Sequence, residues 1–220
     1  MKRKTLALIH TSATLVPVFA QLCKTKLPGV DTFNIVDDSL VRAIGQKGSL
    51  TPDIAQRVDA YIKSAASGGA DYILVTCSSI GPAVEASAKS TAVPVLRVDQ
   101  PMTDRAVAAG RRIGVIATLP TTLNPTADLV RRRATLAGRE IVLTEKLCVG
   151  AFEALMAGDA ARHDAIVAAA LRELSTQVDV ILLAQASMAR VVDTLAPGDR
   201  SVPIFSSPGI AIDHLATVLA

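Results

Sequence analysis

The chain has 220 residues, of which 50% are hydrophobic and 20% are charged, so it can bury the core of one large domain or of two smaller lobes, and disorder and collagen-like repeats are excluded. A formal charge of +3, an aromatic content of 3% and the absence of Trp give no sign of a basic or base-stacking surface. We therefore expect a small polar or anionic ligand and no nucleic-acid partner.

The beginning of the chain carries basic residues followed by an apolar run, as a secretion signal does. His10 and Thr11 interrupt this run, however, and no Ala-x-Ala cleavage site follows. The three cysteines, Cys23, Cys77 and Cys148, have no CxxC spacing and only three histidines to accompany them, so neither a metal site nor a disulfide framework is expected. No apolar stretch approaches the roughly 20 residues that span a bilayer. We expect a cytoplasmic protein without a membrane partner.

In chain order, short β-branched runs alternate with longer Ala-rich amphipathic segments. This alternation is typical of a parallel sheet covered by helices on both faces. Thr51, Pro52 and Asp53 are favourable residues for a helix start, and Gly68 and Gly69 for its end. The predicted strands are 6–9, 32–36, 72–75, 93–98 and 140–144, and the predicted helices are 17–26 and 51–67.

The second half of the chain repeats the first. Three pairs of segments align in order, without gaps and at nearly the same separation: 7–11 with 114–118, 71–79 with 179–187, and 93–96 with 202–205. The repeat predicts an α/β fold of two pseudo-symmetric Rossmann-like lobes, each with a parallel sheet flanked by helices. We expect the first lobe to comprise 1–110 and 205–220, because the final strand and helix should return to it, and the second to comprise 111–204.

Ligands of such sheets bind outside the carboxyl ends of the strands, so we expect an active site in a cleft between the two lobes. Polar residues follow the matched strands, and Ser or Thr there can also simply cap the next helix. A hydroxyl beside free backbone N–H groups nevertheless suits a carboxylate. The candidates are His10, Thr11, Ser12, Cys77, Ser78, Ser79, Thr118, Thr121, Thr122, Gln185 and Ser187. Arg97 and Asp99, after the fourth strand, are expected to pair with each other and are a weaker site candidate.

These segments resemble the aspartate/glutamate/hydantoin racemase superfamily over essentially the whole chain. In that family, each lobe offers a cysteine at the end of a central strand. The segment 75–79, Val-Thr-Cys-Ser-Ser, resembles the first cysteine motif, and 113–118 with Thr121 and Thr122 resembles the carboxylate-binding loop of the second lobe. The segment 183–187 resembles the second cysteine motif in position, but Gln185 stands where the second cysteine would be.

The resemblance implies a cofactor-independent isomerase that acts at the carbon beside the carboxylate of a small acid. The racemases of the family use two thiols on opposite faces of the substrate, whereas Gln185 can neither accept nor return a proton at neutral pH. Cys77 is then the thiol acid/base or nucleophile, and Gln185 is a hydrogen-bond donor or a polar wall. His10 or Cys148 remains open as a second acid/base.

One thiol also suffices for two other reactions that the resemblance implies. These are decarboxylation of a malonate-like acid and isomerisation of a maleate-like acid, with Cys77 as acid or nucleophile. A third alternative is a non-catalytic protein that binds a small acid. The sequence favours no single substrate among these acids, and self-association into a homo-oligomer is expected for an enzyme of either kind.

Overall fold

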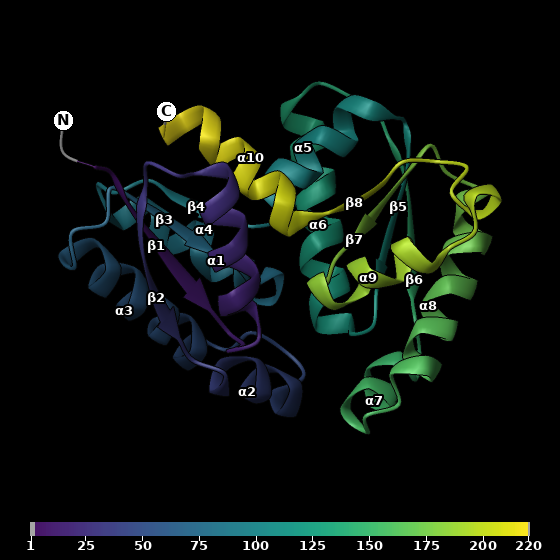
Figure 1. The fold of residues 1–220 in the computed structure, drawn as a ribbon, viewed down its shortest axis with the longest axis horizontal. Coiled ribbons are helices and arrows are strands. Elements are labelled where there is room, and N and C mark those ends of the chain that lie inside the picture. Colours follow the sequence, from purple (N-terminus) through teal and green to yellow (C-terminus); the bar gives the residue numbers. More distant parts are fainter. Residues whose placement is uncertain (1–2, 220) are drawn as a thin grey trace. The chain divides into compact units, whose positions relative to one another are not determined.

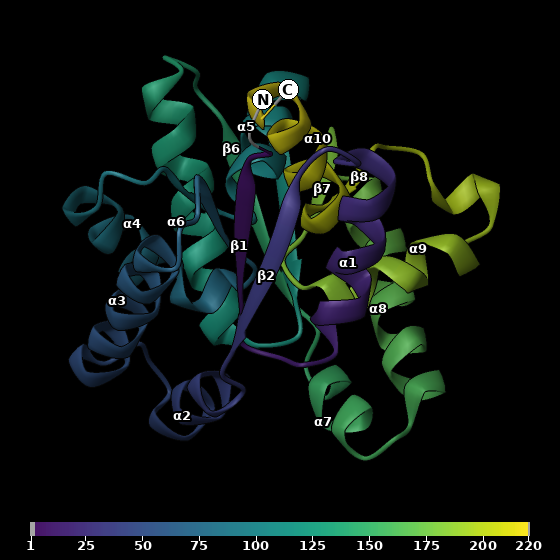
Figure 2. The same cartoon turned by 60° about the vertical axis from the view of Figure 1, so that its left-hand side comes forward.

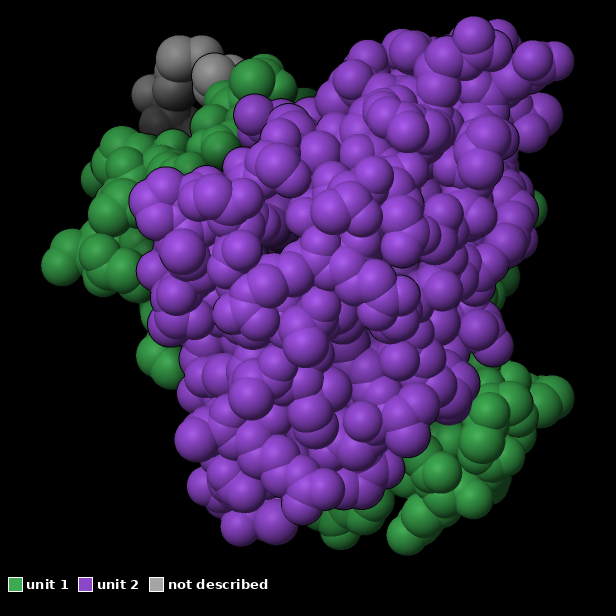
Figure 3. Space-filling view, turned by 90° about the vertical axis from the view of Figure 1, so that its right-hand side faces the viewer, with its two compact units in different colours: residues 1–100, 208–220 green, residues 101–207 purple. Residues whose placement is uncertain are grey.

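The computed structural model describes residues 3–219 and divides into two compact units. One comprises residues 1–100 and 208–220, and the other comprises residues 101–207, coloured green and purple in Figure 3. The boundaries therefore lie near 100 and 207 rather than at the expected 110 and 205. Helix α5 (Gln100–Ala109) and strand β8 (Ile204–Ser206) account for the difference, because both lie almost wholly in the second unit.

The first unit is a parallel four-stranded sheet in the order β2-β1-β3-β4 (Figure 1). Its strands are β1 (Thr5–His10), β2 (Asp31–Val36), β3 (Tyr72–Val75) and β4 (Val95–Arg97). Its helices are α1 (Leu15–Lys26), α2 (Ser39–Lys47), α3 (Pro52–Ser67), α4 (Gly81–Ser87) and α10 (Ser207–Leu219), with short 3-10 turns at Ser78–Ile80 and Ala88–Ser90. The predicted strands of this unit and both predicted helices are present, with ends shifted by two residues or fewer.

The second unit has the same parallel topology, in the order β6-β5-β7-β8. Its other strands are β5 (Arg112–Ala117), β6 (Val142–Leu147) and β7 (Val180–Leu183). Its other helices are α6 (Pro120–Leu136), α7 (Ala151–Met156), α8 (Ala160–Ser175) and α9 (Ala189–Thr194), with 3-10 turns at Ala186–Met188 and Pro197–Asp199. The last strand pairs with β7 and does not return to the first sheet, so only the final helix does so.

The strand register confirms the internal repeat. Ile9 pairs with Val75 across β1 and β3, and Ile116 pairs with Leu183 across β5 and β7, as the sequence alignment of these strands requires. The two aligned segments therefore fill the same place in two copies of one sheet. The α/β class and the two-lobed repeat are confirmed.

Alternating side chains of β1 pack on opposite faces of the first sheet, as expected of a sheet buried on both sides. Ala7 and Ile9 belong to a core with α2, α3 and α4, whereas Leu6 and Leu8 belong to a core with α1 and α10. Figure 2 shows α2 and α3 on one side of β1 and β2 and α1 on the other. This double cover leaves the strand ends as the place where polar side chains gather.

The second sheet packs against α8 and α9 through Ile116, Ile181 and Leu183. The approach of α8 to β5 is close at Gly114, where an added Cβ would lie 2.6 Å from Cδ2 of Leu174. Among residues 3–219, no helix has the length and apolar character needed to cross a membrane.

Candidate functional site

Cys77 lies just beyond the end of β3, where the chain turns from the sheet into a helix. Its backbone is extended, with φ −132° and ψ 122°, and it precedes the 3-10 turn Ser78–Ile80 that leads into α4. The thiol is free and the residue is half-buried, while Ser78 and Ser79 are buried. The structure thus places the three sequence-predicted residues together at one strand end.

His10 ends β1, the neighbouring strand, and is fully buried. Its Nδ1 lies 2.8 Å from Oγ1 of Thr76, and its Nε2 lies 2.9 Å from Oδ1 of Asn34. Burial lowers the pKa of His10, and the hydrogen bond to Asn34 partly opposes this, so the imidazole is neutral near pH 7. Both ring nitrogens have protein partners, which suits a role in holding the residue that precedes Cys77 better than a role in proton transfer.

Thr76 joins the two strand ends. Its backbone N–H donates to the carbonyl of Ile9 over 2.9 Å, and its Oγ1 lies 3.1 Å from the same oxygen. Thr76 and Asn34 are not among the site residues predicted from the sequence. The only signal for Thr76 was a hydroxyl residue beside the cysteine, and Asn34 lies on an edge strand whose pattern shows nothing of its partner.

Thr11 and Ser12 follow His10 in the turn that leads to α1. Thr11 is buried, and Ser12 is half-buried with its Oγ 2.8 Å from Oγ1 of Thr14. The Ser12 carbonyl accepts the N–H of Leu15, so this segment forms the entry to the helix. A substrate contact for either residue stays a prediction.

Gln185 occupies the equivalent position in the second unit. It follows β7 with φ −131° and ψ 135° and precedes the 3-10 turn Ala186–Met188. Its Oε1 accepts two hydrogen bonds from Thr118, one from the backbone N–H at 2.6 Å and one from Oγ1 at 2.9 Å. The side-chain carbonyl is therefore held at the end of β5, and Thr118 uses both of its donors on Gln185.

The remaining predicted residues of the second unit lie on the turns after β5 and β7. Thr121 and Thr122 are in the first turn of α6, half-buried and buried respectively, and the N–H of Thr122 donates to the carbonyl of Leu119. Ser187 lies in the 3-10 turn after Gln185 and is exposed. Their contacts with a ligand stay predictions.

The other two thiols differ from Cys77 in their surroundings. Cys23 is 4% exposed on α1 and Cys148 is 2% exposed after β6. Burial raises the pKa of each thiol to about 11, which disfavours the reactive thiolate form at neutral pH. Cys77 is thus the most accessible of the three free cysteines.

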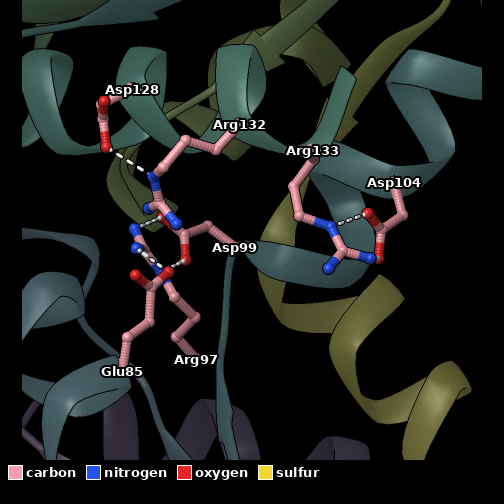
Figure 4. Close-up of polar contacts among 7 residues, drawn as sticks. All are labelled: Glu85, Arg97, Asp99, Asp104, Asp128, Arg132 and Arg133. Atoms are coloured by element: carbon pink, nitrogen blue, oxygen red, sulfur yellow. Dashed lines mark hydrogen bonds and ion pairs between the residues drawn. The ribbon is translucent and has the colours of Figure 1, made fainter. Parts of the chain in front are cut away.

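The expected pairing of Arg97 with Asp99 is confirmed. Nε and Nη2 of Arg97 donate to the two carboxylate oxygens of Asp99 over 2.7 Å and 2.8 Å (Figure 4). Both residues are buried, and the pair lies at the end of β4, the strand that pairs with β3, after which Cys77 lies. Within the described part of the chain, no three His, Cys, Asp or Glu residues gather as metal ligands would.

Solved structures with this fold include several amino-acid and allantoin racemases. Glutamate racemase from Thermus thermophilus is 16% identical with a TM-score of 0.74, over 99% of this chain and 80% of that one. Allantoin racemase from Klebsiella pneumoniae is 17% identical with a TM-score of 0.70, over 98% and 87% of the two chains. Aspartate racemase from Picrophilus torridus is 13% identical with a TM-score of 0.66, over 98% and 92%.

Among curated proteins, no match was found. The Asp/Glu/Hydantoin racemase family model matches residues 7–215, which is nearly the whole chain and includes both strand-end motifs. The chain therefore belongs to the Asp/Glu/hydantoin racemase family, a family of isomerases, as its repeated strand-end segments predict.

Proposed function

We propose that this chain is a cofactor-independent enzyme that acts at the carbon beside a carboxylate of a small acid, with Cys77 as its single thiol acid/base or nucleophile. The observation that carries the proposal is the difference between two equivalent positions. The half-buried free thiol of Cys77 follows β3, whereas Gln185 follows β7 with its carbonyl bound by Thr118. Family membership supports racemase-like chemistry at this carbon.

The chemistry requires a base and hydrogen-bond donors. Removing a proton beside a carboxylate leaves the electron pair on an enediolate-like dianion, which must be stabilised as it forms. In the proposed step, the Cys77 thiolate takes the proton and becomes a thiol, and the electron pair moves onto the carboxylate oxygens. Ser78 and Ser79, which follow Cys77 in the first unit, are the proposed donors to the small carboxylate substrate.

Gln185 makes the proposed chemistry one-sided. A carboxamide neither accepts nor returns a proton at neutral pH. Because Thr118 binds Oε1, the Nε2 amide group is left as the part of the side chain that can donate to a ligand. The thiol then returns a proton to the face from which one was taken, so exchange with solvent is expected to exceed inversion.

The same arrangement favours a second candidate, a one-thiol lyase or isomerase. For a malonate-like acid, the bond to one carboxylate breaks, carbon dioxide leaves, and the Cys77 thiol protonates the resulting enediolate. For a maleate-like acid, the thiolate adds to the double bond, rotation occurs about the new single bond, and the thiolate leaves again. The observation that favours these reactions over two-base racemisation is Gln185 in place of a second thiol.

The test is proton exchange in deuterated water, followed by NMR over aspartate, glutamate, hydantoins, maleate and malonates. Cys77→Ala is compared with Cys23→Ala as a matched control, since Cys23 is buried on α1. Cys77-dependent deuterium incorporation, isomerisation or loss of carbon dioxide supports the proposal and identifies the reaction. Turnover that survives in Cys77→Ala contradicts it, and binding of an acid without turnover in either protein favours a non-catalytic acid-binding protein.

A further inference from the structure

A buried ion-pair network lies beside the 3-10 turn Ser78–Ile80, which follows Cys77 in the first unit. Arg97 is 1% exposed, binds Asp99 through two hydrogen bonds, and donates from Nη1 to Oε1 of Glu85 over 2.8 Å (Figure 4). Asp99 is itself fully buried. A guanidinium held by two carboxylates from different elements has one orientation, because its donors are fixed in a plane.

The guanidinium lies against the backbone that follows Cys77. An added Cβ at Gly81 would lie 2.3 Å from Cζ of Arg97 and 2.4 Å from Nη2. Gly81 is the first residue of α4, directly after the 3-10 turn that begins beyond Cys77. Any other residue at Gly81 would displace the guanidinium or the turn. The glycine is therefore required for close packing at a position where its φ is ordinary for a helix, −50°.

The strand that carries Arg97 also holds the other end of the turn. Arg97 pairs in register with Val75, the last residue of β3. The N–H of Val98 donates to the carbonyl of Val75 over 3.0 Å. The end of β4 thus fixes the segment 75–81 at both ends, by its backbone before Cys77 and by the Arg97 side chain after it.

We propose that Arg97 is a positioning residue for Cys77: its guanidinium, held by Asp99 and Glu85 and packed on Gly81, fixes the turn that presents the thiol. This inference rests on the proposed function for the importance of the thiol to turnover. The effect of Arg97 on the reactivity of the thiol can be measured without turnover. A change in the geometry of the turn would change the position and orientation in which the thiol is presented.

The experiment measures the rate of Cys77 alkylation by iodoacetamide at one fixed pH, with peptide mapping to identify the modified thiol. The variants are Arg97→Lys, Gly81→Ala and Glu85→Gln. Arg97→Lys keeps the charge but loses the planar fork, and Gly81→Ala places a methyl group against the guanidinium. Cys23 and Cys148, both buried, serve as internal reference thiols in every sample.

We expect alkylation of Cys77 to slow by about tenfold in Arg97→Lys and Gly81→Ala, because a displaced turn no longer presents the thiol in its fixed orientation. Glu85→Gln is expected to act in the same direction but less, since it weakens the bond from Glu85 to Arg97 and leaves the two bonds from Arg97 to Asp99. The matched control is Asp104→Asn, which removes the charge of the bidentate partner of Arg133 in the second unit and should leave Cys77 unchanged.

A loss of thermal stability with unchanged or faster alkylation of Cys77 would overturn the proposal, because Arg97 would then be only a structural ion pair. Glu85→Gln decides the question if Arg97→Lys does not fold, since the Glu85 side chain is 31% exposed and the substitution keeps its shape. If the proposed function is wrong, Cys77→Ala keeps the turnover of the wild type. The alkylation rates of Cys77 in the other variants still test the role of Arg97, so the two failures are distinguishable.

Discussion

Cys77 and Gln185 occupy the same backbone position in two copies of one sheet. Each follows the third strand of its unit in sequence, has an extended backbone with φ near −130°, and precedes a three-residue 3-10 turn. The preceding residues match as well, since Thr76 donates from its N–H to Ile9 and Ala184 does so to Ile116. The two units therefore present one thiol and one carboxamide through the same local structure.

Because the backbone position is the same, Gln185→Cys should supply the missing second thiol. We expect this variant to raise the ratio of racemisation to deuterium exchange by about tenfold or more for any substrate that exchanges, since general acid–base groups contribute factors of this order. The ratio is measured by chiral chromatography and NMR on the same samples. Gln185→Ser is the control, because serine provides a small polar group without a thiol. An unchanged ratio in Gln185→Cys would contradict the proposal that Cys77 transfers protons at only one face of the substrate.

His10 gives the first unit a dependence of stability on pH. Its pKa is lowered by burial, so the folded state binds the proton less readily than the unfolded chain does. The stabilising contribution is thus fully present above about pH 6.5, the unfolded-state value, and declines as the pH falls below it. Urea unfolding at a series of pH values should show this decline in the wild type and a smaller one in His10→Gln.

The control for this prediction is His214→Gln, because His214 is exposed on α10. This variant should keep the pH dependence of the wild type. Equal slopes of unfolding free energy against pH in the wild type and in His10→Gln would show that the imbalance in proton binding lies elsewhere.

The fold could be predicted from the sequence because the repeat and the β-branched runs are local signals. The aligned segments identified three of the four strand pairs related by the repeat, and Arg97 and Asp99 were close enough in sequence for their pairing to be expected. The contact between Oε1 of Gln185 and Thr118 could not be predicted from the sequence, since it joins residues far apart in the chain. The proposed cleft and self-association stay predictions.

Asp179 should stabilise the second unit in a way that acid removes. Its carboxylate accepts hydrogen bonds from the backbone N–H groups of Arg112 and Arg111 and from the Arg112 guanidinium, and these bonds, that from the Arg112 backbone foremost, lower its pKa to about 2. The equivalent Asp71 accepts the N–H of Thr5. Asp179 thus joins the start of β7 to the start of β5.

A lowered carboxylate pKa stabilises the folded state above the unfolded-state value of about 3.9, and this stabilisation is lost as the pH falls toward 2. We therefore expect Asp179→Asn to lower the melting temperature at pH 7 and the difference from wild type to shrink between about pH 4 and pH 2. Calorimetry across this range checks it. Asp193→Asn, at an exposed position on α9, is the control. A difference independent of pH would contradict the electrostatic cause.

Gly114 should be required for the packing of α8 on β5. An added Cβ would lie 2.6 Å from Cδ2 and 2.9 Å from Cγ of Leu174. We expect Gly114→Ala to lower the free energy of unfolding by about 1–3 kcal/mol, the usual cost of overpacking a core. The equivalent position in the first unit, Ala7, already carries a methyl group and is fully buried, so the restriction comes from Leu174 and not from the strand.

A double-mutant cycle separates these causes. In a Leu174→Ala background, which removes the clashing atoms at a cost of its own, Gly114→Ala should cost less than it does in the wild type or become stabilising. Urea denaturation of the four proteins at one pH provides the comparison. The same penalty in both backgrounds would place the cause in the backbone of β5, where glycine would be needed for its conformation and not for its small size.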